Sequence, residues 1–155
     1  MPRPVCICGP PLLSFCVGPT ERSTHGPRNR FVATFVLPDC QPRWLDFLSK
    51  PKRRSSFLHR LADDRDFDSR LRVPIPPSYQ TPESVAAQLQ KLHAPTACHL
   101  ISEQTELDGR DMDLLAALEL VIGSGLGTVI SCIPGKLAYY EGEMPGDRYV
   151  LHCKT

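Results

Sequence analysis

Proline is the residue that most restricts how this chain can fold. The chain has 155 residues and 16 prolines, about twice the usual share, and half of the prolines lie before residue 43. Proline lacks a backbone N–H and fixes φ, so it interrupts helices and central strands. Residues 1–42 have no sustained helical or strand periodicity, apart from one strand-like stretch at 30–37. We therefore expect residues 1–42 to be a poorly ordered tail and residues 43–155 to be one globular domain.

Cysteine is also concentrated in the predicted tail. Four of the seven cysteines lie before residue 43. Such an abrupt change of composition is what translated upstream sequence would give, so we hypothesise that residues 1–42 are not part of the natural protein. Mass spectrometry of the native N-terminus tests this hypothesis, and an intact peptide from Cys6 to Arg22 would contradict it.

The overall composition is that of an ordinary globular protein. Hydrophobic residues make up 41% of the chain and charged residues 23%, and the formal net charge is +1. This near-neutral balance argues against broad attraction to nucleic acid or to a membrane surface. No run of about 18 apolar residues is present, which argues against a transmembrane helix. An odd number of cysteines argues against a fully paired disulfide framework, so we expect a cytoplasmic protein with free thiols.

Three segments have the apolar spacing and end signals of helices. The first two are expected over residues 51–62 and 82–94, each with a proline at an early helical position. Asp111 is expected to cap the third helix, and Gly123 to end it in the left-handed conformation. Residues 112–122 of this helix are apolar nearly all round, which predicts a buried central helix.

Four segments are expected to be strands. They are residues 97–102, 128–133, 136–141 and 148–153, and the last three are joined by connections short enough to force antiparallel pairing. The strand at 97–102, the third helix and the strand at 128–133 are expected to form a right-handed crossover. The predicted fold is therefore α+β, with a small mixed sheet in the order α-α-β-α-β-β-β and two further helices packed on it.

Carboxylates and tyrosines form the most prominent set of candidate catalytic residues. They follow the strand at 97–102 or lie on the hairpin after residue 136, and they are Glu103, Glu106, Asp108, Tyr139 and Glu141. Carboxylates beside a tyrosine can do general acid–base work or hold a divalent cation. The alternative is that polar loops and ordinary strand alternation explain all of them. The hairpin also predicts an exposed protein-interaction surface made of Tyr139, Tyr140, Glu141 and Glu143.

A basic run offers a second and weaker candidate site. Its members are Lys50, Lys52, Arg53 and Arg54. They could contact nucleic-acid phosphate, but nearby aspartates offset their charge. The alternative is a solvated first turn of a helix.

Metal and nucleotide sites are not indicated. Cys98 and His99 are neighbours on a predicted strand, so they point to opposite faces and do not share an ion. The glycine run at 123–127 follows a helix instead of preceding one, which is typical of a helix cap and turn, not of a phosphate loop.

We therefore expect a small soluble domain without a cofactor or a metal. The favoured function is a non-catalytic protein-interaction or regulatory module with a protein partner, because the sequence has no cofactor loop, catalytic triad or metal spacing. The first alternative is a small metal-assisted hydrolase that uses the acidic and tyrosine residues. A weaker alternative is nucleic-acid contact through residues 50–54. Whether the chain is an enzyme stays open, with the balance against it.

Overall fold

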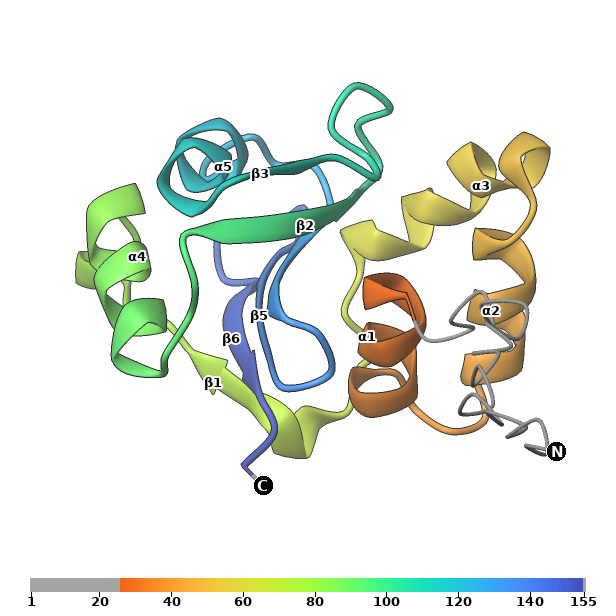
Figure 1. The fold of residues 1–155 in the computed structure, drawn as a ribbon, viewed down its shortest axis with the longest axis horizontal. Coiled ribbons are helices and arrows are strands. Elements are labelled where there is room, and N and C mark those ends of the chain that lie inside the picture. Colours follow the sequence, from red (N-terminus) through yellow and green to blue (C-terminus); the bar gives the residue numbers. More distant parts are fainter. Residues whose placement is uncertain (1–25, 155) are drawn as a thin grey trace, which may run out of the picture.

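The computed structural model describes residues 26–154, which form three layers (Figure 1). A six-stranded sheet lies in the middle. One face is covered by α4 (Pro82–Lys91) and α5 (Leu114–Val121), and the other by α1 (Pro27–Phe35), α2 (Gln41–Leu48) and α3 (Pro51–Leu58). Three short 3-10 helices lie in the connections: η1 (His59–Ala62), η2 (Ser69–Leu71) and η3 (Pro77–Tyr79). This architecture confirms the predicted α+β class.

Every neighbouring pair of strands is antiparallel. The order across the sheet is β1-β6-β5-β4-β2-β3. The strands are β1 (Arg72–Pro74), β2 (Ala97–Ser102), β3 (Asp111–Asp113), β4 (Thr128–Ile133), β5 (Leu137–Glu141) and β6 (Arg148–His152). The predicted order of elements lacks α1, α2 and the short strands β1 and β3.

The expected mixed sheet is corrected, because β2 and β4 pair antiparallel instead of parallel. The physical reason is β3. A turn at Gly109, where φ is 80°, returns the chain beside β2 before α5 begins. Helix α5 therefore connects β3 to β4, which lie on either side of β2.

Helix α5 is an outer-layer helix and not the enclosed central helix that its composition predicts. Leu114, Leu118 and Val121 are buried against the sheet, whereas Leu115 and Leu120 remain 39% and 52% exposed. The reason is that a helix lying on one face of a sheet can bury only one side. The predicted helix end is confirmed, because Gly123 has a φ of 85°.

The opposite layer begins earlier in the chain than predicted. Phe31, Val32 and Phe35 of α1 are at most 1% exposed and pack in the core that lies against this face of the sheet. The boundary at residue 43 is therefore corrected, because residues 27–42 contain α1 and the start of α2. What was predicted for residues 1–25 lies outside the described residues. None of the helices in the described part of the chain has the length and apolarity needed to cross a membrane.

Candidate functional site

Glu141 lies at the centre of a buried polar cluster. Tyr139 donates its hydroxyl hydrogen to one carboxylate oxygen of Glu141 at 2.9 Å, and the Gly123 N–H donates to the other oxygen at 2.9 Å. Arg148 places Nε 3.6 Å from the same carboxylate. Burial, followed by the neighbouring Glu141, raises the pKa of Tyr139. This cluster joins the end of α5 to β5 and β6, so its polar groups are used inside the protein.

Tyr140 points to the opposite face of the sheet from Tyr139. Its hydroxyl donates to the Leu61 carbonyl oxygen at 2.6 Å, and its ring packs edge-on against Phe67. The expected exposed surface on this hairpin is therefore corrected: Tyr139, Tyr140 and Glu141 are buried, and Glu143 alone of that set is exposed. The reason is that helices cover both faces of β5.

Two carboxylates of the acidic loop after β2 also form contacts within the protein. Glu103 accepts a hydrogen bond from the Gly127 N–H at 3.0 Å, so Glu103 and Glu141 hold the two ends of the glycine run. Asp108 accepts from the Ser102 N–H at 3.1 Å and pairs with Arg54, while Glu106 is exposed. Of the five candidate catalytic residues, Tyr139 and Glu141 alone are shown in contact with each other, so the five do not converge on one site.

The basic run divides in the same way. Arg54 turns inward to Asp108, and Lys50 pairs with Asp46 at 2.6 Å on the surface. Lys52 and Arg53 are exposed beside a hollow of about 550 Å³ at the start of α3. Two of the four basic side chains are thus without an ion pair to a described residue.

A hydrogen-bonded histidine lies where α1 meets β2 and β3. His99 places Nδ1 2.7 Å from a carboxylate oxygen of Asp111, and Arg28 donates from Nε to His99 Nε2 at 3.2 Å. Sequence reasoning missed this group because β3 was not predicted. The signal that could have found it is the Asp108-Gly109 turn, which brings residue 111 opposite residue 99.

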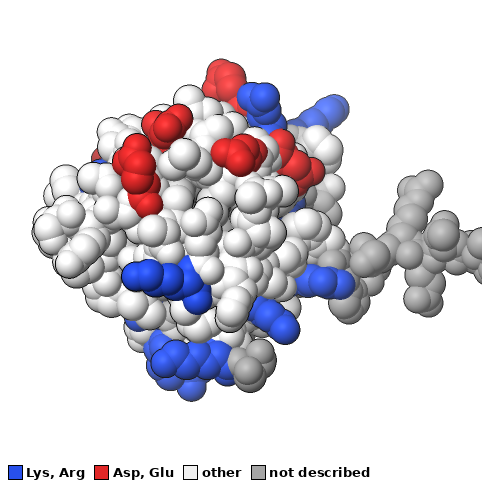
Figure 2. Space-filling view, turned by 60° about the vertical axis from the view of Figure 1, so that its left-hand side comes forward, with Lys and Arg blue, Asp and Glu red and all other residues white. Residues whose placement is uncertain are grey.

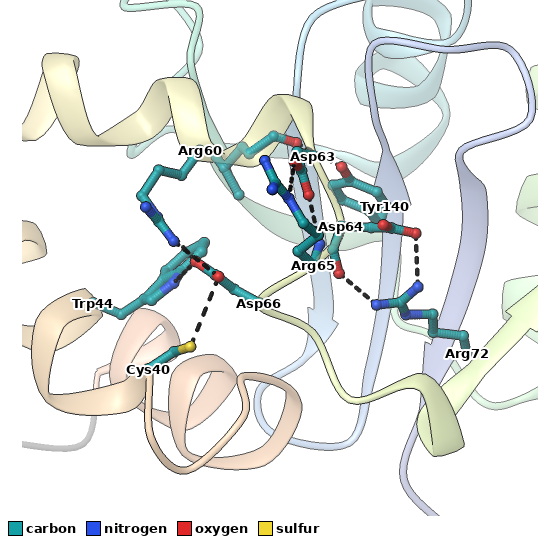
Figure 3. Close-up of polar contacts among 10 residues, drawn as sticks. Cys40, Trp44, Arg60, Asp63, Asp64, Arg65, Asp66, Arg72 and Tyr140 are labelled. Carbon is teal, nitrogen blue, oxygen red and sulfur yellow. Dashed lines mark hydrogen bonds and ion pairs between the residues drawn. The ribbon is translucent and has the colours of Figure 1, made fainter.

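A second polar cluster lies beside η1, next to a hollow of about 260 Å³ that is lined by His59, Arg60, Asp63, Arg65 and Asp66. Figure 3 shows Cys40, Trp44 and Arg60 converging on Asp66, with Arg72 turned toward Asp64. In the lining of the hollow, Arg60 pairs with Asp66 and Arg65 pairs with Asp63, which indicates a structural role for these charges.

A groove of about 490 Å³ with a mainly apolar lining lies between η3 and α4. It is lined by Pro76, Tyr79, Ser84, Ala87, Gln88 and Lys91. Figure 2 turns the side of α4 forward and shows acidic side chains in the upper part, with some basic ones beside them at the upper right. Further basic side chains lie below, and the band between is largely uncharged. This surface has the mixed character of a protein-binding site.

Comparison with known proteins finds no matching family model, no similar curated protein and no similar solved structure. Within residues 26–154 there is no group of three or more metal-ligating side chains. The surfaces of residues 26–154 are therefore the guide to function.

Proposed function

We propose that the protein is a protein-interaction module, and that the groove between η3 and α4 is its binding surface. The observation that carries the proposal is Tyr79, whose side chain is 59% exposed at the groove. All four tyrosines lie in the described part of the chain, and the other three are buried or half-buried. Tyrosine is enriched at protein interfaces because it joins a large ring to a hydrogen-bonding hydroxyl.

The backbone around Tyr79 supports a pre-organised contact. The Tyr79 N–H donates to the Pro76 carbonyl oxygen at 2.9 Å, and the Gln80 side chain donates to the Ile75 carbonyl oxygen at 2.8 Å. Pro76 and Pro77 further restrict the backbone. A backbone held in this way loses little conformational entropy when a partner covers the groove.

The other groove residues indicate the chemistry of the partner. Ser84 and Ala87 are small, so a partner chain can approach α4 closely. Lys91 is exposed and takes part in none of the ion pairs formed among residues 26–154. A segment that places an apolar side chain beside Tyr79 and a carboxylate beside Lys91 fits both features.

A displayed library of random peptides tests this proposal. We expect the selected peptides to combine apolar and acidic residues, and Tyr79→Ala to weaken their binding about tenfold, equivalent to about 1.4 kcal/mol. Lys91→Glu should shift the selection away from acidic peptides. Binding is measured by fluorescence anisotropy.

Leu120→Ala is the matched control, because it removes an exposed apolar side chain from α5, outside the groove. It should leave peptide affinity unchanged. Peptides that bind Tyr79→Ala and Lys91→Glu as tightly as the unmodified protein would contradict the proposal. A library that yields no binder would contradict it as well.

Nucleic-acid contact through Lys52 and Arg53 is the weaker proposal, supported by the hollow at the start of α3. It predicts affinity for single-stranded or duplex oligonucleotides that falls steeply with salt. The metal-assisted hydrolase has no comparable support, because its carboxylates, apart from the exposed Glu106, are bound by backbone N–H groups, an arginine and a tyrosine. We expect either interaction to take place in the cytoplasm.

A further inference from the structure

Three side chains form one row across adjacent strands of the sheet. Ser131 of β4 lies opposite His99 of β2, and His99 lies opposite Asp111 of β3. Residues paired in this way point to the same face of a sheet. Ile101 and Val129, two residues along the same strands, belong to the core on the α1 side. The row Ser131–His99–Asp111 therefore faces α1.

The hydrogen bonds fix the tautomer of His99. Arginine can only donate, so the bond from Arg28 Nε makes His99 Nε2 an acceptor without hydrogen. The hydrogen of the ring then lies on Nδ1 and is donated to Asp111 at 2.7 Å. This tautomer, with a carboxylate behind it, is the one that a general base needs to deprotonate a serine.

Ser131 is the unexplained member of the row. It is 2% exposed, and its Oγ has no hydrogen-bond partner among the described residues. Buried hydroxyl groups nearly always have a partner, so an unpaired one beside a neutral histidine calls for a reason.

We propose that Ser131, His99 and Asp111 are a Ser–His–Asp nucleophile for esters and other activated acyl groups, held at rest by Arg28. This activity goes beyond the proposed peptide-binding groove and uses none of its residues. Ser131 Oγ bonds to the carbonyl carbon and gives its proton to His99 Nε2, while Asp111 stabilises the imidazolium. The bond to the leaving alcohol breaks, and the alkoxide takes the proton. Water then adds to the acyl carbon through His99, which releases a carboxylic acid and restores the serine.

Arg28 explains why the row is inactive in this structure. It lies in the first turn of α1, occupies the basic nitrogen of His99 and belongs to the layer that covers Ser131. Its guanidinium lies directly against Gly109, because a Cβ placed there would be 2.2 Å from an Arg28 nitrogen. Movement of the first turn of α1 would free Nε2 and uncover Ser131 together.

A small fluorophosphonate ester tests the proposal on the full chain. Ser131 Oγ would attack phosphorus, fluoride would leave, and His99 would take the hydroxyl proton. In Arg28→Met, which keeps the aliphatic stem but loses the donor, we expect the Ser131 adduct to form at least about tenfold faster than in the unmodified protein. His99→Gln in the same background should slow it about a hundredfold, and Ser131→Ala should abolish it. Adducts are located by peptide mass spectrometry.

Arg30→Met is the matched control, because Arg30 is an exposed arginine of the same helix. It should label as slowly as the unmodified protein. Arg28→Gln is tested beside Arg28→Met, and circular dichroism verifies folding, so that one unstable variant does not decide the outcome. A folded Arg28 variant without an adduct on Ser131 overturns the proposal. Equal rates for the unmodified protein and Arg28→Met overturn the role of Arg28.

Discussion

Asp66 illustrates how the charged residues of this protein are used at the scale of single side chains. It is only 8% exposed and accepts hydrogen bonds from Trp44 Nε1 at 2.9 Å and from Arg60 at 3.0 and 2.9 Å. The bonds connect α2, η1 and the following loop through one carboxylate. Buried carboxylates are stable only when such donors surround them, so this arrangement specifies how the helices of this layer meet.

Asp66→Ala should lower the free energy of unfolding by about 3 kcal/mol, because the Trp44 N–H and part of the Arg60 guanidinium lose their partner in the interior. Urea unfolding measures the change. Asp46→Ala is the control, since Asp46 forms an exposed pair with Lys50 and should cost at most about 0.5 kcal/mol. Equal losses for the two variants would contradict the central role given to Asp66.

Among the helices and strands, prolines set where helices begin, and a glycine sets how closely two segments approach. Pro27, Pro42, Pro51 and Pro82 each lie in the first turn of a helix, where the missing N–H has no intrahelical partner to lose. Proline therefore begins helices in this chain and does not only prevent them. Gly127 has another role, because it lets the chain entering β4 pass against the backbone of η1.

Gly127→Ala should destabilise the protein by about 2–3 kcal/mol, since the added Cβ would lie 2.2 Å from the backbone carbon of Leu61 and 2.4 Å from the nitrogen of Ala62. The atoms that the Cβ would meet belong to the backbone of η1, so no change of side-chain rotamer can make room for it. Gly146→Ala is the matched control, because a Cβ there meets nothing within 4 Å. Thermal unfolding of the two variants compares them, and a neutral Gly127→Ala would show that η1 does not approach β4 this closely.

In the whole molecule, helices cover both faces of the sheet, and residues on both edge strands disfavour pairing with another chain. Pro74 in β1 and the two aspartates of β3 lie on the outer strands, where they disfavour pairing with another chain. One of the two covering layers includes α1, whose Phe31, Val32 and Phe35 pack in the same core as Ile101 and Val129 of the sheet. Residues 27–42 are therefore integral to the folded unit.

Removal of residues 1–42 should abolish cooperative thermal unfolding. Burial of Phe31, Val32, Phe35 and Val36 contributes about 8 kcal/mol at about 2 kcal/mol for each side chain, which is comparable with the about 5–15 kcal/mol of a whole domain. Removal of residues 1–25 is the control, since it leaves all of these residues in place. Differential scanning calorimetry compares the two chains. A cooperative transition in the shorter chain would restore residue 43 as the start of the domain.

The local signals in the sequence were sufficient for the α+β class and for the helices around residues 51–62, 82–94 and 112–122. Capping residues and apolar spacing act within a few positions along the chain, so they can be interpreted without knowledge of the fold. The same locality explains the predicted end of α5 at Gly123. Strand segments after residue 128 were also visible, because β-branched and apolar residues alternate with clear turns.

Tertiary structure alone decided which residues share a site. Glu103, Asp108 and Glu141 looked like one acidic patch, but the sheet register assigns them to a glycine N–H, an arginine and a tyrosine. The Asp108-Gly109 turn signals only the pairing of His99 with Asp111. The full row with Ser131 comes from three strands, and its assembly depends on how those strands pair. Register is a long-range property, since a shift of one residue would turn each of these side chains to the other face.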